Sequence, residues 1–285
     1  MPTPAELLFV WLRSRLDRAP QEWLDGQRRK LAQGAERDLY LAISLVPRTL
    51  GKADLAPEPA ELEAADAARP GWDPRGWSVD QAGRIALLLA GGGSGEGFAA
   101  RLEQLFATAD VSEQIALYRG LPLYPDPERH VVRAREGARS GMRPLFEAVA
   151  HQSPYPMERF DDNAWNHMVL KALFIGSTLA PIQGLDRRAN PELMRMLSDY
   201  AHERWAAERP VSPELWRCVG PFADDAALDD LARVLASATP AERRAAVLAL
   251  SACPAPRARA MLDEQPALLA EVCSGALRWD DLAGG

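Results

Sequence analysis

The densest run of ionisable side chains in this sequence is SDYAHERWAAERPVSPELW, residues 198–216. Its His202 and Glu203 match the start of His-Glu-x-x-His, a motif in which two imidazoles one helical turn apart bind zinc. Ala206 occupies the position of the second imidazole. A zinc-protease site of the usual kind is therefore excluded.

The same run predicts a polar stripe on one helix. Asp199, His202 and Glu203 are spaced three and four residues apart or adjacent, so they lie on one side of the helix. Asp199 could accept a hydrogen bond from His202 and orient the imidazole for acid–base chemistry. These three are the candidate catalytic residues, and Arg204 is a candidate ligand-binding residue. The alternative is a solvated, salt-bridged face whose Arg204 braces a neighbouring helix.

A second group of polar side chains lies in FDDNAWNHMVLKALFIG, residues 160–176. Asn163, His167 and Lys171 recur at every fourth position, with Asn166 alongside. Glu and Lys would be better helix formers on a solvated face. The row is therefore more typical of a ligand-binding groove, or of hydrogen bonds buried between helices. All four side chains are candidate ligand-binding residues, and both interpretations stay open.

The segment IQGLDRRANPELM connects these two helices. Asn190 followed by proline predicts a helix N-terminus, and Gly184 suits a turn with positive φ. Asp186, Arg187 and Arg188 are then left in a loop beside both helices. The two arginines could hold a phosphate or carboxylate. Alternatively, Asp186 clamps the loop through one of them.

No metal site and no cofactor are predicted. The four histidines, His130, His151, His167 and His202, lack metal-ligand spacing. For His130 and His151 we expect capping or surface roles. The cysteines Cys218, Cys253 and Cys273 include no CxxC pair, so we expect mostly buried thiols in a reducing compartment. The glycine-rich AGGGSGEGF lacks the Lys-Ser/Thr of a phosphate loop and predicts a helix connection.

The pattern of the whole chain predicts an all-α fold. Ala, Leu, Glu and Arg favour helices, and apolar residues recur at spacings of three and four. Short helices separated by Gly or Pro predict antiparallel pairs stacked like HEAT repeats. One early helix carries the apolar residues from Leu7 to Leu16. A second carries Leu31, Leu39, Ile43 and Val46 and is expected to end near Pro47. Further helices are predicted over 59–68, 79–90, 97–108, 112–119, 127–137, 141–151, 161–175, 191–208, 212–220, 224–237, 240–252, 254–263 and 266–274.

A Pro-, Ala- and acid-rich connection occupies residues 53–78. Trp72 and Trp77 near its end are expected to pin it to the rest of the fold. We therefore divide the chain into an N-terminal helical segment, 1–78, and a helical-repeat region, 79–285. The two are expected to form one continuous domain.

Charge and hydropathy argue against two classes of partner. The chain has 33 Lys and Arg against 40 Asp and Glu, a net charge of −7, and its longest basic block is RRK. Nucleic acid is therefore not expected as a partner. Arg13 and Arg15 interrupt the apolar N-terminal patch, and no window approaches the roughly 18 uncharged residues that span a bilayer. We expect no signal peptide, no membrane insertion and a cytoplasmic location.

Three blocks resemble the EboA family: RPGWDPRGWSVDQAGRIALLL, DDNAWNHMVLKALFIG, and IQGLDRRANPELM with the run that follows it to VGPF. EboA proteins are encoded in ebo clusters of bacteria and some algal plastids. Those clusters also encode a UbiA-type prenyltransferase, a TatD-like hydrolase, and dehydroquinate-synthase-like, sugar-isomerase-like and phosphodiesterase-like proteins. The resemblance implies a role in making or exporting a small metabolite, such as a sunscreen-pigment precursor. It implies no particular reaction and no catalytic residues.

The first functional hypothesis is a non-catalytic helical-repeat protein of an ebo-type pathway. It would bind a small polar or anionic metabolite, or another ebo-cluster protein, in a groove between helices 161–175 and 191–208. The stacked-helix pattern favours this hypothesis, and so does the lack of a complete catalytic motif in the sequence.

The alternative is an all-α enzyme of the same pathway. His202 would act as acid or base with Asp199 as its orienting partner. Lys171 and either Arg187 or Arg188 would bind an anionic group of the substrate. This hypothesis requires all of these side chains to converge on one pocket.

Overall fold

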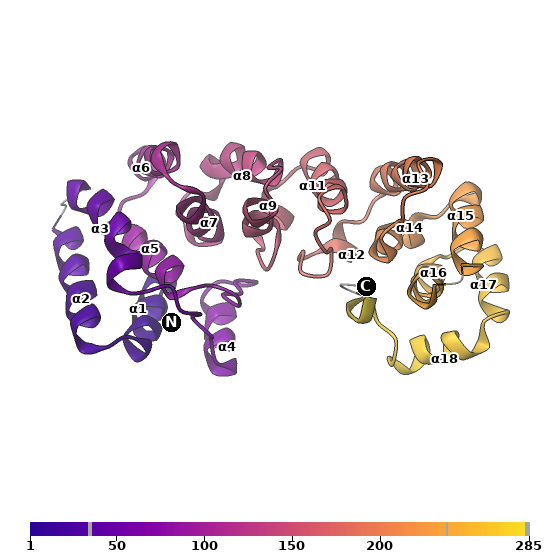
Figure 1. Cartoon of the computed structure of the whole chain (residues 1–285), viewed down its shortest axis with the longest axis horizontal. Coiled ribbons are helices and arrows are strands. Elements are labelled where there is room, and N and C mark those ends of the chain that lie inside the picture. The colour runs from indigo at the N-terminus through magenta and orange to yellow at the C-terminus, as the bar shows by residue number, and fades with distance from the viewer. Residues whose placement is uncertain (34–35, 238, 283–285) are drawn as a thin grey trace. The chain divides into compact units, whose positions relative to one another are not determined.

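The structure is a computed structural model, and it describes residues 1–33, 36–237 and 239–282. These residues form α-helices and short 3₁₀ turns without a β-strand, which confirms the predicted all-α fold. The chain divides into two compact units, Met1–Phe160 and Asp161–Gly285. Figure 1 labels the helices of both units except α10. The HEAT-like stacking of helix pairs stays a prediction.

The first unit is organised around α5, which is covered on most sides. The helices of this unit are α1 (Pro4–Arg15), α2 (Arg18–Ala32), α3 (Glu36–Thr49), α4 (Pro59–Ala68), α5 (Val79–Ala90), α6 (Gly95–Thr108), α7 (Val111–Arg119), α8 (Val131–Ala138), α9 (Arg143–Ala150) and α10 (Tyr155–Arg159). Helix α5 packs against α1, α2, α3 and α7, and α9 packs against α7 and α8. Residues 1–78 and the helix that follows them therefore share one unit (Figure 1).

The connection between α3 and α5 is held by three tryptophans, as expected for two of them. Trp72 and Trp77 are buried, and their ring centroids lie 6.1 Å apart. Trp11 of α1 completes the cluster, with its ring centroid 5.4 Å from that of Trp72. These large apolar contacts fix a segment whose composition would otherwise favour a loose chain.

Three predictions for this unit need correction. The single helix predicted to carry Leu31 and Val46 is two helices, α2 and α3, and residues 34–35 between them lie outside the described residues. Pro47 lies inside α3, which continues to Thr49. Proline lacks the N–H that would bond to the carbonyl four residues earlier, so α3 forgoes that hydrogen bond and ends two residues later. His130 is buried against Phe98 and Tyr124 and not at the surface, and although it stands at the N-cap position of α8, its side chain forms no cap hydrogen bond.

The second unit begins with α11 and is centred on α16. Its helices are α11 (Asp162–Phe174), α12 (Leu185–Arg188), α13 (Pro191–Ala206), α14 (Trp216–Val219), α15 (Asp225–Leu235), α16 (Pro240–Ala252), α17 (Pro256–Asp263) and α18 (Pro266–Ser274). Helix α13 packs against α11 and α14, and α16 packs against α14, α15, α17 and α18. The predicted helix at 212–220 is a 3₁₀ turn, Pro213–Leu215, followed by α14.

Local sequence signals set the N-termini of α11 and α13, the second of them as predicted. The Asp161 carboxylate accepts the Ala164 backbone N–H at 2.8 Å and caps α11. The Asn190 side chain accepts the Leu193 N–H at 2.9 Å and caps α13. Gly184 has φ of +85°, the left-handed conformation that its turn requires. The apolar face of α11 is buried: Trp165, Met168, Val169, Ala172 and Leu173.

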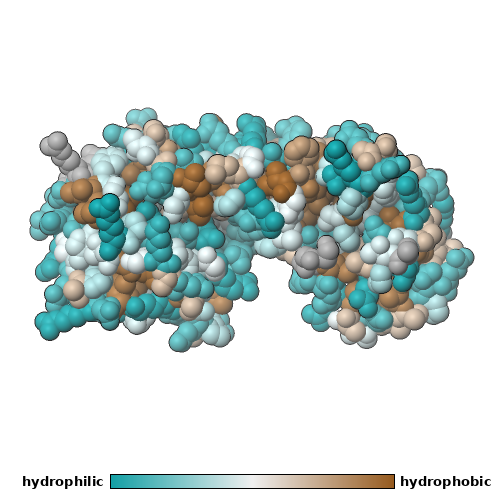
Figure 2. Space-filling view, in the orientation of Figure 1, coloured by the Kyte–Doolittle hydropathy of each residue, from teal (hydrophilic) through white to brown (hydrophobic). Residues whose placement is uncertain are grey.

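The surface is mostly hydrophilic, with separate apolar groups (Figure 2). The most exposed large apolar side chains inside described helices include Val132, at 72 %, and Phe174, at 71 %. Within the described part of the chain, no helix has the length and apolar character needed to cross a membrane.

Candidate functional site

All the candidate catalytic and ligand-binding residues lie on α11, α12 and α13, in the second unit. The most buried of them, Asn166, exchanges two hydrogen bonds with Asn190. The Asn166 Nδ2 donates to Asn190 Oδ1 at 3.2 Å, and the Asn190 Nδ2 donates to Asn166 Oδ1 at 2.8 Å. Because Asn190 also caps α13, this amide pair joins the start of α13 to the middle of α11. Asn166 is therefore part of a hydrogen-bond network between helices.

Asp186 and Arg188 lie on the short helix α12 and not in the predicted loop, and both pair with neighbouring elements. Both Asp186 oxygens accept hydrogen bonds from Arg217, at 2.8 and 2.9 Å. This hydrogen bonding lowers the pKa of Asp186 and raises the pKa of Arg217. Arg188 donates to Asp162 at 2.6 Å, and its guanidinium lies 4.9 Å from the Trp165 ring centroid. Asp186 clamps its segment, as one alternative had it, but through Arg217.

His202 contacts a different carboxylate from the one expected. Its Nε2 lies 2.8 Å from both oxygens of Asp230, which belongs to α15. The contact joins α13 to α15. Asp199 and Glu203 are exposed on α13, so the predicted polar stripe does face solvent.

The aromatic residue beside His202 belongs to the same helix contact. Trp205 stacks on Trp216 with ring centroids 5.8 Å apart, and Arg233 of α15 lies 4.1 Å over the Trp205 ring. Arg204 donates from Nε to the Pro210 carbonyl at 3.0 Å, at the C-terminal end of the helix. The polar and aromatic residues of 198–216 therefore serve these contacts, which hold the C-terminal end of α13 in place.

One face of α11 points away from these contacts. Asn163 and His167 are exposed, and Lys171 is partly exposed with its Nζ 5.4 Å from the Phe174 ring centroid. Spacings of four, four and three residues place the four side chains on one side of a helix. We call these residues, Asn163, His167, Lys171 and Phe174, the α11 strip.

Glu214 is a buried carboxylate that the sequence reasoning missed. It is 5 % exposed and accepts the backbone N–H groups of Leu179 and Ala180, at 2.8 to 3.1 Å. The 3₁₀ turn that carries Glu214 thereby holds the segment between α11 and α12. Its only sequence signal is an acidic residue among apolar ones in the PELW stretch.

The first unit contains a second missed cluster. Asp80 and Arg84, each 2 % exposed, form an ion pair one turn apart on α5. Ser78 donates to Asp80 at 2.5 Å, and Glu113 lies 3.7 Å from Arg84. A charged pair inside the apolar stretch DQAGRIALLL is the signal that could have found it. Through the contact of Arg84 with Glu113, this cluster links α5 to α7.

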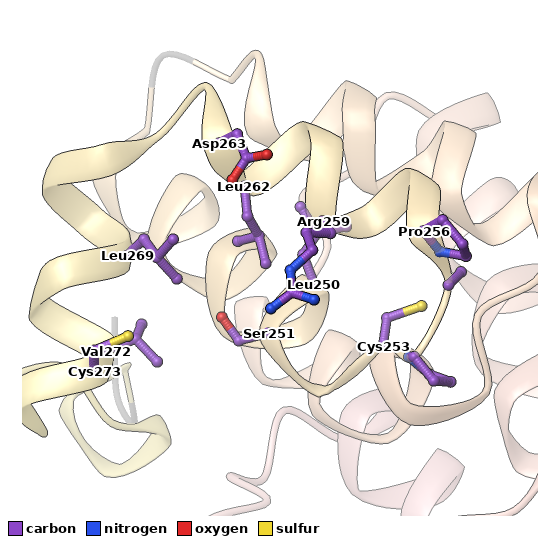
Figure 3. Close-up of a pocket in the computed structure, with 12 residues that line it drawn as sticks. Leu250, Ser251, Cys253, Pro256, Arg259, Leu262, Asp263, Leu269, Val272 and Cys273 are labelled. Atoms are coloured by element: carbon purple, nitrogen blue, oxygen red, sulfur yellow. The ribbon is translucent and has the colours of Figure 1, made fainter.

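A cavity of about 770 Å³ lies among α16, α17 and α18 (Figure 3). Cys253, which is partly exposed, and Cys273, which is exposed, line it, while burial raises the pKa of Cys218 to about 12. The expectation of mostly buried cysteines is therefore wrong for two of the three. Among the described residues no group of three or more His, Cys, Asp or Glu side chains is placed to hold a metal.

These features define an all-α protein whose polar residues mainly join neighbouring helices. A comparison with protein families matches residues 4–220 to the family described as metabolite traffic protein EboA. The chain belongs to this family, as the resemblance of its sequence blocks indicates. Neither the comparison with curated proteins nor the comparison with solved structures found a match. Helices α16, α17 and α18 lie beyond the matched residues.

Proposed function

We propose that this protein is a non-catalytic component of an ebo-type metabolite pathway, and that it binds a partner enzyme of the pathway through the α11 strip. The description of its family as metabolite traffic proteins supports a role in handling a metabolite. The α11 strip carries the proposal of a binding surface, because its composition differs from that of a solvated helix face.

Phe174 is the central observation. Its side chain is 71 % exposed on a helix whose opposite face is fully packed. Lys171 lies over the ring, so the strip offers an apolar anchor beside a positive charge. Aromatic anchors dominate the binding energy of protein interfaces, and a helix commonly presents them at such spacings. A partner with an apolar pocket and an acidic rim would match the strip.

The proposed lack of catalysis rests on the partners of the candidate residues. His202 contacts Asp230, Asp186 pairs with Arg217, and Arg188 pairs with Asp162. Each contact joins two elements of the second unit. We assign these residues to the scaffold that fixes α11, because their polar atoms are directed at neighbouring protein groups.

The test uses purified proteins encoded in the same gene cluster, each titrated with this protein by interferometry. Phe174→Glu should weaken binding of one of them at least tenfold, because truncating an aromatic anchor costs about 2 kcal/mol or more. Val132→Glu, at an equally exposed apolar position of the first unit, should leave the affinity unchanged. Equal affinity of both variants, or no binding of any cluster protein, contradicts the proposal.

One observation favours the enzyme as a second candidate. A histidine next to a carboxylate is a common acid–base arrangement, and His202 with Asp230 provides one at 2.8 Å. In this account Asp230 replaces Asp199 as the orienting residue. Turnover of a polar pathway metabolite by the wild type, lost in His202→Ala and retained in Asp199→Ala, would establish it.

A further inference from the structure

The cavity among α16, α17 and α18 has the size of a small-molecule site. Its volume of about 770 Å³ falls within the roughly 300–1,000 Å³ of ligand pockets. Apolar side chains from all three helices line it, among them Leu250, Leu262, Leu269 and Val272. Figure 3 shows them around a common space. A mostly apolar lining with few polar groups is the usual make-up of such a pocket.

Helix α18 gives an independent indication that the cavity is incompletely filled. Its sequence, PALLAEVCS, is strongly apolar, yet none of its residues is buried. Leu269 and Val272 line the cavity instead of packing into a closed core. Apolar surface left in contact with water is unfavourable by roughly 25 cal/mol per Å². A bound apolar group would cover this face.

Arg259 supplies the charge. It projects from α17 toward Leu250 and Ser251 of α16 in Figure 3, and it lines the cavity. Asp263, one turn further along α17, also lines the cavity, but no ion pair joins it to Arg259 among the described residues. A guanidinium beside an apolar space matches a carboxylate, sulfonate or phosphate through charge-assisted hydrogen bonds.

We infer that this cavity binds a small amphipathic anion, with its apolar body against α16 and α18 and its anionic group on Arg259. This ligand site is separate from the α11 strip and does not depend on the proposed partner. It lies beyond residues 4–220, so the family match says nothing of it. The carrier function it implies is the non-covalent sequestration of an anionic metabolite with an apolar part.

The first test titrates the full chain with 8-anilinonaphthalene-1-sulfonate, an aromatic sulfonate that fluoresces in apolar sites. Arg259→Gln should weaken binding about tenfold, the loss expected for one charge-assisted contact. Leu269→Glu should weaken it similarly by placing a carboxylate in the apolar part. Arg244→Gln, on the exposed side of α16, should bind like the wild type. Equal affinity of all four proteins, or no binding by the wild type, overturns the inference.

The second test separates the charge from the apolar body. Decanoate should displace the fluorescent probe from the wild type better than decanol does, and Arg259→Gln should abolish this preference. An unchanged preference in Arg259→Gln assigns the charge recognition elsewhere and overturns the role of Arg259.

The cysteines report occupancy of the cavity directly. Decanoate should slow the reaction of Cys253 and Cys273 with N-ethylmaleimide severalfold, because both line the cavity. Cys218 is fully buried and should remain unlabelled in every folded variant. Unchanged labelling rates at saturating decanoate contradict binding at this site. None of these readouts involves a protein partner, so failure here is distinct from failure of the proposed function.

Discussion

Asn166 of α11 and Asn190 at the N-terminus of α13 satisfy one another through two reciprocal amide hydrogen bonds. Asn166 is 2 % exposed, so neither water nor a ligand can easily replace its partner. This pair sets Asn166 apart from the other polar residues predicted on α11. Asn166 belongs to the interior, whereas Asn163 and His167 belong to the surface.

A double-mutant cycle measures this pair. Asn166→Ala and Asn190→Ala should each destabilise the fold, and the combined variant should lose less than the sum. The expected coupling is about 1–2 kcal/mol, because two hydrogen bonds contribute roughly 0.5–1.5 kcal/mol each. Urea unfolding of the four proteins gives the values. Strict additivity would show that the amides do not interact in solution.

Replacing Glu214 should have a large effect on the free energy of unfolding, although this residue lies outside the candidate site. Glu214→Ala leaves the buried N–H groups of Leu179 and Ala180 without their acceptor, so the free energy of unfolding should fall by about 2–4 kcal/mol. These two amides should also exchange hydrogen faster. The matched control is Glu192→Ala, an exposed glutamate paired only one turn away, with an expected change within about 0.5 kcal/mol. Similar losses in both variants would count against the buried contact.

A side chain at position 220 should clash with the backbone of α16. A Cβ at this position would lie 2.3 Å from the Ala249 carbonyl oxygen and 2.7 Å from its Cα. Backbone cannot yield cheaply, so Gly220→Ala should destabilise the second unit by about 1–3 kcal/mol. Gly26→Ala, in α2 with nothing within 4 Å of the new Cβ, should instead stabilise by about 0.5–1 kcal/mol. Thermal unfolding of both variants decides whether the close approach exists.

The Asp186–Arg217 pair should make a small, pH-dependent contribution to the free energy of unfolding. The pKa of Asp186 is lowered from its ordinary value of 3.8 by its hydrogen bond with Arg217. The contribution is therefore fully present above about pH 4 and is lost as the pH falls through the lowered value. Because the Asp186 side chain is 67 % exposed, it should stay below about 1 kcal/mol. Urea unfolding of wild type and Asp186→Asn should differ at pH 7, and the difference should shrink as the pH is lowered below 3.8. A constant difference would assign the effect to something other than this titration.

The sequence predicted what depends on neighbouring residues. The Asn190–Pro191 pair and Gly184 set their helix ends as expected, and the Asp161 cap of α11 is likewise a contact within three residues. The predicted helix at 240–252 coincides with α16, because proline begins it and the apolar period is unbroken. The apolar face of α11 follows from the same period.

The partners of the polar side chains could not be predicted from neighbouring residues. His202 contacts Asp230, which is 28 positions away, and Glu214 contacts a segment 34 and 35 positions away. Local spacing offered Asp199 as the nearest carboxylate to His202, but tertiary packing brings Asp230 of α15 to its imidazole instead. The cavity is likewise defined by how three short helices meet, which no single motif encodes.

The most direct test of the account is photo-crosslinking from residue 174. A benzoylphenylalanine replacing Phe174 would retain an aromatic anchor and react with whatever covers the α11 strip. The account predicts a crosslink to one cluster-encoded enzyme from position 174, suppressed by Lys171→Glu, and none from the same group placed at Val132. Crosslinks of equal yield from both positions, or none from position 174 in a mixture where the proteins do associate, would contradict it.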